Sequence, residues 1–192
     1  SQLIFYIGHG LDEHFFKNIE DDSKLVRLDE YVDLLNGEVY ADNETHEDGQ
    51  MHHQKSGIDP HYWLSINNTL GIVMQIGNYL KKEYPSEISI IENNESEYIN
   101  QLSKANIEFI ESLSKIDRKD IITFHSAWNY FADDYGLNII ESIESSAGVS
   151  PTIGDFAEII ELIKINNIET IYLEPQLPKT ILDGLVNDYG LD

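Results

Sequence analysis

The sequence predicts an α/β fold with a mostly parallel sheet. After residue 117, short apolar runs alternate regularly with longer amphipathic segments. Strands that alternate with helices need crossover connections, and such connections make neighbouring strands parallel. The apolar runs, such as LIFYI at residues 3–7, are short and continuous, which is typical of strands buried in such a sheet.

The first half of the chain is expected to start as strand, helix, strand. QLIFYIG (2–8) and KLVRL (24–28) are typical of buried strands, and the apolar residues of LDEHFFKNIED (11–21) recur at helical spacing. Residues 36–58 are polar and loop-like. Ser65 is a candidate N-cap for the next helix, which carries one apolar face and ends near EYPSE. That face would consist of Ile66, Leu70, Val73, Ile76 and Leu80.

A long helix is predicted next. The tetrapeptide NESE, Asn94 to Glu97, has capping-box spacing, and apolar residues then recur at steps of three and four as far as Ile116. A helix of about 22 residues would be roughly 33 Å long. This length is unusual within a small domain and indicates a strut.

The second half is predicted to alternate strands with helices. Gly136 and Gly190 are expected to end two of the helices, because glycine is the favoured residue just after a helix. The expected strands are DIITF (120–124), LNIIES (137–142) and IETIYLE (168–174). The expected helices are SAWNYFADDYG (126–136), TIGDFAEIIELIKINN (152–167) and PKTILDGLVNDYG (178–190).

The charge and the absence of cysteine exclude several partners. The chain has 35 acidic and 12 basic residues and a formal net charge of −23, which disfavours nucleic acid and anionic membranes. There is no cysteine, so there is no disulfide partner, and a transition-metal site must use histidine and carboxylates. No apolar run approaches the roughly 20 residues that span a bilayer.

Two histidines occupy positions suited to metal binding. His61, in GIDPHYWLS, lies between a turn-forming Asp-Pro pair and two aromatic residues. His125 directly follows a predicted strand, at the edge where open α/β sheets bind ligands. Either histidine alone is better explained as a structural residue, bonded to backbone or capping a helix. Together, in a chain without cysteine, they favour a shared metal site.

Several other side chains are candidates for the same chemistry. Asp59, Glu174 and His9 are possible further ligands, or partners that hydrogen-bond to a ligand. The alternatives are a turn carboxylate for Glu174 and a cleft-lining role for His9. Three loop histidines lie among acids and are candidates for weak metal capture, or for a solvated loop. They are His46, His52 and His53.

Motifs for nucleotide binding and hydrolysis are weak or missing. GHGLDE has Glu13 where a dinucleotide-binding loop needs its third glycine. The sequence contains no G-x-x-x-x-G-K-[ST], no G-x-S-x-G and no H-E-x-x-H.

Three segments carry a resemblance to a known family. DPHYWLS (59–65), FHSAWNYFADDYGL (124–137) and the stretch from SPTIGDF to LEPQLP (150–178) resemble segments of metal-specific solute-binding proteins of bacterial ABC transporters, cluster A-I type. The resemblance implies two Rossmann-like α/β lobes with mostly parallel sheets, joined by one long rigid helix. We therefore expect a first lobe at 1–92, a linking helix at 93–116 and a second lobe at 117–192.

The resemblance also implies a function. His61 would be the first-lobe ligand and His125 the second-lobe ligand, and a histidine at the second place favours Zn²⁺ over Mn²⁺. The expected protein is a monomeric high-affinity zinc receptor that delivers Zn²⁺ to an ABC transporter permease. It would act in the periplasm or on the extracellular face of the membrane, secreted or lipid-anchored, and would not be an enzyme. The alternatives are a manganese receptor, a surface adhesin and a zinc-dependent hydrolase.

Two ligands of the resembled family do not match any residue here. The family's earliest ligand histidine would precede Ser1, and its last ligand, an aspartate, would follow Asp192. We interpret the sequence as a fragment of a longer receptor; the alternative is a chain that has lost tight metal binding.

Overall fold

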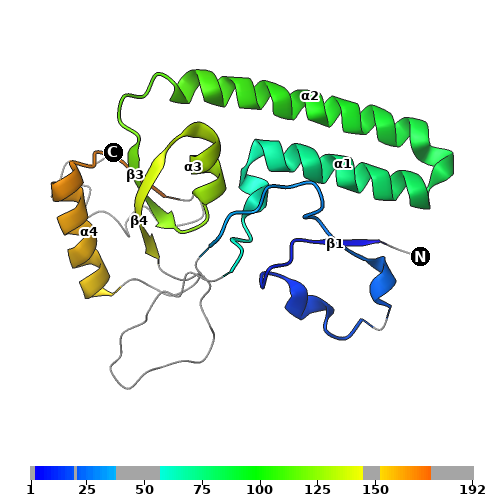
Figure 1. Ribbon diagram of the computed structural model, residues 1–192, viewed down its shortest axis with the longest axis horizontal. Helices are drawn as coiled ribbons and strands as arrows, with labels where there is room; N and C mark the ends of the chain where they lie inside the picture. The colour runs from blue at the N-terminus through cyan, green and yellow to red at the C-terminus, as the bar shows by residue number, and fades with distance from the viewer. Residues whose placement is uncertain (1–2, 20, 38–56, 145–151, 174–192) are drawn as a thin grey trace. The chain divides into compact units, whose positions relative to one another are not determined.

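The chain is described from a computed structural model, which covers residues 3–19, 21–37, 57–144 and 152–173 (Figure 1). Its contacts divide it into two compact units, Ser1–Ile110 and Glu111–Asp192. Both units contain parallel strands with helical connections. The predicted α/β class is therefore confirmed.

The first unit opens with a two-stranded parallel sheet. Strand β1 (Ile4–Tyr6) pairs with β2 (Leu25–Arg27), with Phe5 opposite Val26. The helix predicted over 11–21 is wrong. Its described residues form one short 3₁₀ turn, η1 (Glu13–Phe16), and a second, η2 (Asp22–Lys24), follows directly after the segment. Neither turn contains a buried residue. A regular helix there would lack an apolar face buried against the unit, which is the main source of helix stability.

Helix α1 (Ile66–Glu83) begins where the sequence predicts. The Ser65 hydroxyl accepts a hydrogen bond from the backbone N–H of Asn68 at 3.1 Å, directly after the 3₁₀ turn η3 (Tyr62–Leu64). The most buried face differs from the predicted apolar one, because it contains Asn68 and Gln75. Their amides pair with backbone groups at the end of β2 and just after it. Asn68 accepts from the Asp33 N–H at 2.8 Å and donates to the Asp33 carbonyl at 2.9 Å. Gln75 accepts from the Glu30 N–H and donates to the Arg27 carbonyl.

Helix α2 (Ile88–Leu113) follows α1 almost at once, through the 3₁₀ turn η4 (Pro85–Glu87). The predicted start at the NESE capping box is wrong, because Asn94 lies inside the helix. Pro85 supplies the fixed φ that opens a helical segment. The first glutamate of NESE, Glu95, pairs with α1 instead of capping a helix. Glu95 Oε2 accepts from Lys81 Nζ of α1 at 2.9 Å. The boundary between the two compact units falls in the last turn of α2.

The second unit contains a three-stranded parallel sheet in the order β4-β3-β5. Its strands are β3 (Asp120–His125), β4 (Asn138–Glu144) and β5 (Ile171–Tyr172). Helices α3 (Asn129–Tyr135) and α4 (Ile153–Asn166) lie on opposite sides of the strands (Figure 1). The core joins α4 to the sheet through Ile122, Phe124, Ile143, Ile159, Ile163, Ile168 and Ile171.

Of the two glycine helix ends predicted in this unit, one lies within the described residues. Gly136 ends α3 with a φ of 65°, as the sequence predicts, because this left-handed conformation strains any residue with a Cβ. The helix expected at 178–190 lies outside the described residues. Among the helices of the described ranges, none combines the length and apolar character needed to cross a bilayer.

Candidate metal-binding residues

His61 is held by a neighbouring carboxylate. Asp59 Oδ1 lies 2.7 Å from Nδ1 of the His61 ring and accepts the backbone N–H of the same residue at 2.9 Å. An ionised carboxylate can only accept hydrogen bonds, so Nδ1 carries the ring proton. The lone pair is then on Nε2, the form in which imidazole binds a metal ion. Asp59 is 3% exposed and the His61 side chain 17%.

The backbone around Asp59 is tightly packed. Asn36 and Ile58 form an antiparallel bridge, and the Asp59 N–H donates to the Leu35 carbonyl at 3.0 Å. A Cβ on Gly37 would come within 2.8 Å or less of three Asp59 atoms, so only glycine fits there. These contacts fix the carboxylate that in turn orients the imidazole.

The aromatic residues after His61 anchor it to the unit. Tyr62 is fully buried, and its hydroxyl donates to the Ile7 carbonyl at the end of β1, at 2.8 Å. The Trp63 ring lies against the His61 ring with centroids 5.4 Å apart. The sequence prediction that a rigid turn and an aromatic anchor flank this histidine is therefore confirmed.

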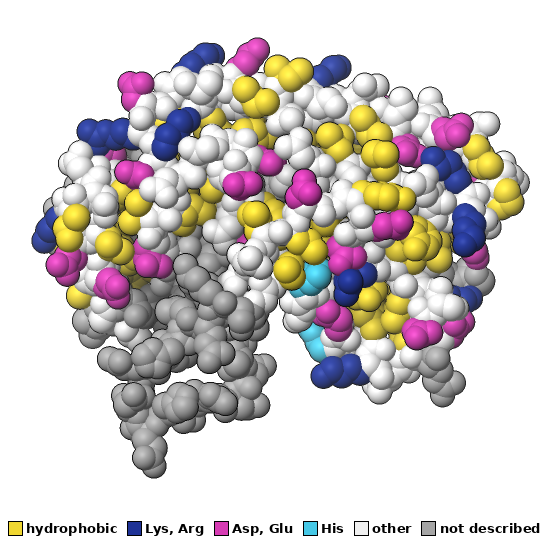
Figure 2. All heavy atoms as spheres, in the orientation of Figure 1, with side chains coloured by type: hydrophobic (Ala, Val, Ile, Leu, Met, Phe, Trp, Pro, Cys, Tyr) yellow, Lys and Arg dark blue, Asp and Glu magenta, His cyan; other side chains and the backbone are white. Residues whose placement is uncertain are grey.

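His9 lies in the same unit but has its own partners. Its backbone has a φ of 58°, and its Nε2 is 3.1 Å from Asp29 Oδ2. The same carboxylate oxygen pairs with Arg27 Nε at 2.6 Å, so His9 belongs to a small ionic cluster. Its ring stands edge-on to Tyr62, with centroids 6.1 Å apart. Figure 2 shows histidine side chains at the surface beside acidic and basic ones.

His125 closes β3 at the carboxyl edge of the second sheet, as predicted. Its register partner on β4 is Glu144, and its Nδ1 lies 3.2 Å from Glu144 Oε2. The two atoms are within ion-pair distance, although their geometry is not that of a hydrogen bond. Both side chains are mostly buried, at 23% and 15% exposed.

The predicted site residues are only partly brought together. Asp59 and His61 are in contact, whereas His9 pairs with Asp29 and His125 with Glu144. Within the described residues of each unit, no three candidate ligands group around one point. The four remaining candidates lie outside the described residues: Glu174, His46, His52 and His53.

Two partners of the histidines were missed from the sequence. Asp29 comes two residues after β2, and Glu144 is the last residue of β4. The ending of LNIIESIE contains the signal for Glu144, because a carboxylate at a strand end shares the sheet edge with His125. No comparable pattern marks Asp29.

The family model described as zinc-uptake complex component A, periplasmic (ZnuA) matches residues 1–192. The chain belongs to this family. The resemblance found in the three sequence segments is thus confirmed, and the family consists of metal solute-binding proteins, not enzymes.

Relatives in the family bind different metals. The chain is 31% identical over 158 residues to the zinc-binding lipoprotein AdcA of Streptococcus pneumoniae (strain ATCC BAA-255 / R6). The matched region covers 82% of this chain and 31% of AdcA. It is 23% identical to the manganese-binding lipoprotein MntA of Halalkalibacterium halodurans, over 98% of this chain and 60% of that protein. The chain therefore spans about a third of the length of the AdcA proteins it matches.

Solved structures share the fold. A crystal structure of ZnuA matches all of this chain and 70% of its own, with a TM-score of 0.78 at 23% identity. The Zn(II)-bound ZnuA-like domain of Streptococcus pneumoniae AdcA matches 70% of this chain and 51% of its own, with a TM-score of 0.61 at 32% identity.

Proposed function

We propose that this chain is part of a zinc receptor that captures Zn²⁺ and delivers it to an ABC transporter permease. The observation that carries the proposal is the Asp59–His61 pair, in which a buried carboxylate 2.7 Å from Nδ1 leaves the lone pair on Nε2. Carboxylates placed in this way orient metal-binding histidines and raise their basicity.

His125 is proposed as the ligand from the second unit. It ends a central strand at the edge where α/β sheets bind ligands, beside Glu144. Two imidazoles alone would hold zinc weakly, since closed zinc sites have about four ligands. We propose that further ligands come from parts of the protein outside the described residues.

Zinc is favoured over manganese because both proposed ligands are imidazoles. Imidazole suits zinc, whereas manganese favours carboxylate, carbonyl and water oxygen. The likeness to a manganese-binding lipoprotein keeps a manganese receptor as the second candidate. An adhesin would bind matrix proteins without help from either histidine. The family match gives no support to a hydrolase.

The proposed place of action is outside the cytoplasmic membrane. Support comes from relatives named as lipoproteins and from a family named as periplasmic. A monomer is proposed, which light scattering would check. Deleting the gene should slow growth in a chelator, and added zinc should restore growth.

The decisive test is calorimetric zinc titration of the full-length gene product that contains these residues. We expect one tight site, and a loss of about 100-fold or more in affinity for His61→Ala and for His125→Ala, more than the loss of a ligand's outer partner causes. His14→Ala is the control, because His14 is exposed and stacks on the neighbouring Phe15. Equal affinity in all four proteins would refute the proposal.

Two further titrations test which metal the protein prefers and whether imidazole binds it. A manganese excess should fail to displace zinc if the imidazoles are ligands, whereas ready displacement would favour the manganese receptor. Zinc affinity should decrease when the pH is lowered below about 6, because imidazole must lose its proton to bind a metal.

A further inference from the structure

The second unit repeats, on a different scaffold, the arrangement seen around His61. In both units a carboxylate oxygen lies next to Nδ1 of a histidine, at 2.7 Å for Asp59 and His61 and at 3.2 Å for Glu144 and His125. Asp59 is two residues from its histidine in a turn. Glu144 is nineteen positions away and meets His125 only through strand pairing.

Strand register places Glu144 beside His125. Thr123 pairs with Ser142, and His125 pairs with Glu144, so both pairs project from one face of β3 and β4. The first pair shows that side chains on this face are in direct contact, because the two hydroxyl oxygens lie 2.8 Å apart. The opposite face carries Ile122 and Ile143 into the core.

The surroundings of the Glu144–His125 pair strengthen its electrostatic interaction. The His125 and Glu144 side chains are 23% and 15% exposed, and Thr123, at the preceding level, is 1% exposed. In a partly buried place water screens the pair less, so the carboxylate favours a proton on the nitrogen that faces it. A modest rotation of either side chain at 3.2 Å would give a hydrogen bond.

We propose that Glu144 is a positioning residue that keeps the ring proton of His125 on Nδ1 and so directs Nε2 toward the metal ion. The expected effect on metal affinity rests on the proposed function, whereas the tautomer of His125 does not depend on it. Both histidines would then meet zinc through the same nitrogen, each oriented by its own carboxylate.

The tautomer of His125 tests this directly. Long-range ¹H–¹⁵N spectra of the zinc-free, full-length protein above pH 8 distinguish a proton on Nδ1 from one on Nε2, and His125→Gln assigns the signals. We expect the Nδ1–H form in the native protein and a shift toward Nε2–H in Glu144→Ala. Glu141→Gln is the matched control, because Glu141 lies on the same strand, is exposed, and accepts from the Ser142 N–H.

Affinity and spectroscopy complete the test. Glu144→Ala should weaken zinc binding by about 10- to 100-fold, and the isosteric Glu144→Gln by less, because its amide oxygen can still accept the Nδ1 proton. The visible spectrum of the Co²⁺-loaded protein should keep its shape in both variants, since a positioning residue is not a ligand.

Two outcomes would overturn the inference. One is an unchanged His125 tautomer in Glu144→Ala. The other is a changed ligand field with Co²⁺, which would make Glu144 a ligand itself. If the native protein binds no zinc, the proposed function fails, yet the tautomer measurement still decides the role of Glu144. Circular dichroism of each variant checks that the fold is intact.

Discussion

Asp59 binds His61 at two points, through the ring Nδ1 at 2.7 Å and through the backbone N–H at 2.9 Å, both to the same carboxylate oxygen. One buried acceptor thus fixes both the chain direction and the ring plane of the proposed ligand. The contact arises between residues only two apart in the chain, yet its rigidity comes from Leu35 and Gly37, which pack on Asp59 from elsewhere in the unit.

Removing the charge of Asp59 should weaken metal binding without unfolding the protein. Asp59→Asn keeps the shape and an oxygen acceptor but removes the negative charge that faces Nδ1 of His61, so we expect a 10- to 100-fold loss of zinc affinity, as is typical when a ligand's partner is changed. Calorimetry measures the change. Asp29→Asn is the control, because Asp29 pairs with His9 and Arg27. An unchanged affinity in Asp59→Asn would contradict this role.

Two glycines of α1 should respond differently to alanine. A Cβ at Gly71 would overlap the backbone carbonyl of Tyr31, which cannot move without shifting the chain. We expect Gly71→Ala to lower the free energy of unfolding by about 1–3 kcal/mol, the usual cost of overpacking. At Gly77 the Cβ would meet the carboxylate end of Glu95, which can rotate away, and alanine favours the helix by roughly 1 kcal/mol.

Urea denaturation of the two alanine variants measures this difference. The expected order of stability places Gly77→Ala well above Gly71→Ala. Equal destabilisation by the two changes would contradict the distinction between a rigid backbone neighbour and a flexible side-chain neighbour.

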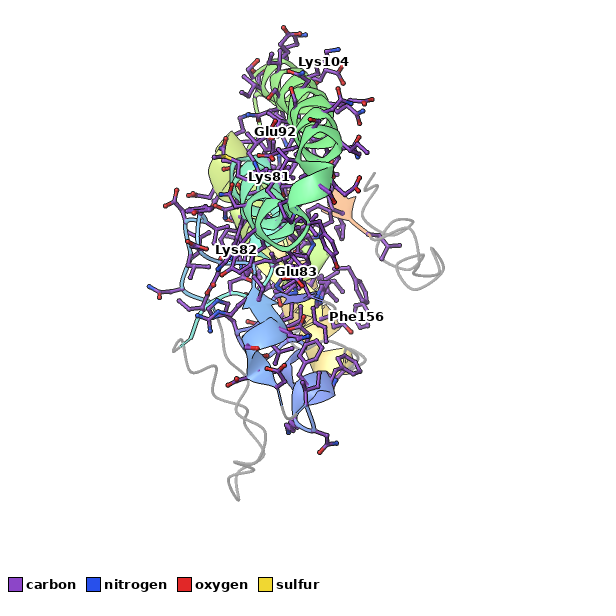
Figure 3. The ribbon with its side chains drawn as sticks, turned by 90° about the vertical axis from the view of Figure 1, so that its right-hand side faces the viewer. Lys81, Lys82, Glu83, Glu92, Lys104 and Phe156 are labelled. Carbon is purple, nitrogen blue, oxygen red and sulfur yellow. The ribbon has the colours of Figure 1, made fainter. Side chains whose placement is uncertain are left out.

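The ion pair between α1 and α2 should contribute little. Lys81 lies where α1 faces α2, while Lys82 lies farther from α2 (Figure 3). Lys81 Nζ is 2.9 Å from Glu95 Oε2, with both side chains partly exposed. We expect Lys81→Met to lower the free energy of unfolding by less than about 1 kcal/mol, with a smaller effect at 1 M salt. Lys82→Met should have no effect, and a loss above 2 kcal/mol at Lys81 would be inconsistent with this account.

Glu13 should make stability depend on pH in the acid range. Partial burial alone would raise the pKa of Glu13, but hydrogen bonds from backbone N–H groups outweigh it and hold the pKa below its usual range. The Gly10 N–H donates to both carboxylate oxygens, at 3.0 and 3.2 Å. A lowered pKa in the folded state stabilises the protein above the unfolded-state pKa of about 4.3. That contribution is lost as the pH falls through the folded-state pKa.

A comparison at two pH values isolates this contribution. Glu13→Gln should be less stable than the native protein at pH 7, by up to about 1 kcal/mol, and the gap should narrow near pH 3. Glu92→Gln is the control, because Glu92 is exposed on α2. A difference in stability that grows at acid pH would show that the pKa of Glu13 is not lowered in the folded protein.

The sequence by itself determined the strands, the α1 N-cap at Ser65, the glycine end of α3 and the placement of His61 and His125 at element junctions. Each of these depends on residues close together in the chain: an apolar run, a hydroxyl three residues before an amide, a glycine at positive φ. Three motifs in order also sufficed to identify the family, because proteins of the same fold keep such motifs in the same order and at similar spacing.

Only the tertiary structure decided which groups meet. The 11–21 segment has helical spacing, but its 3₁₀ turn η1 contains no buried residue, so a helix there would gain little from packing. The NESE box has capping spacing, but the chain is already helical from Ile88, and Glu95 is used to reach Lys81. Buried Asn68 and Gln75, Asp29 beside His9, and Glu144 beside His125 all depend on partners at least nineteen residues away. Such contacts follow from packing and strand register, which no local pattern specifies.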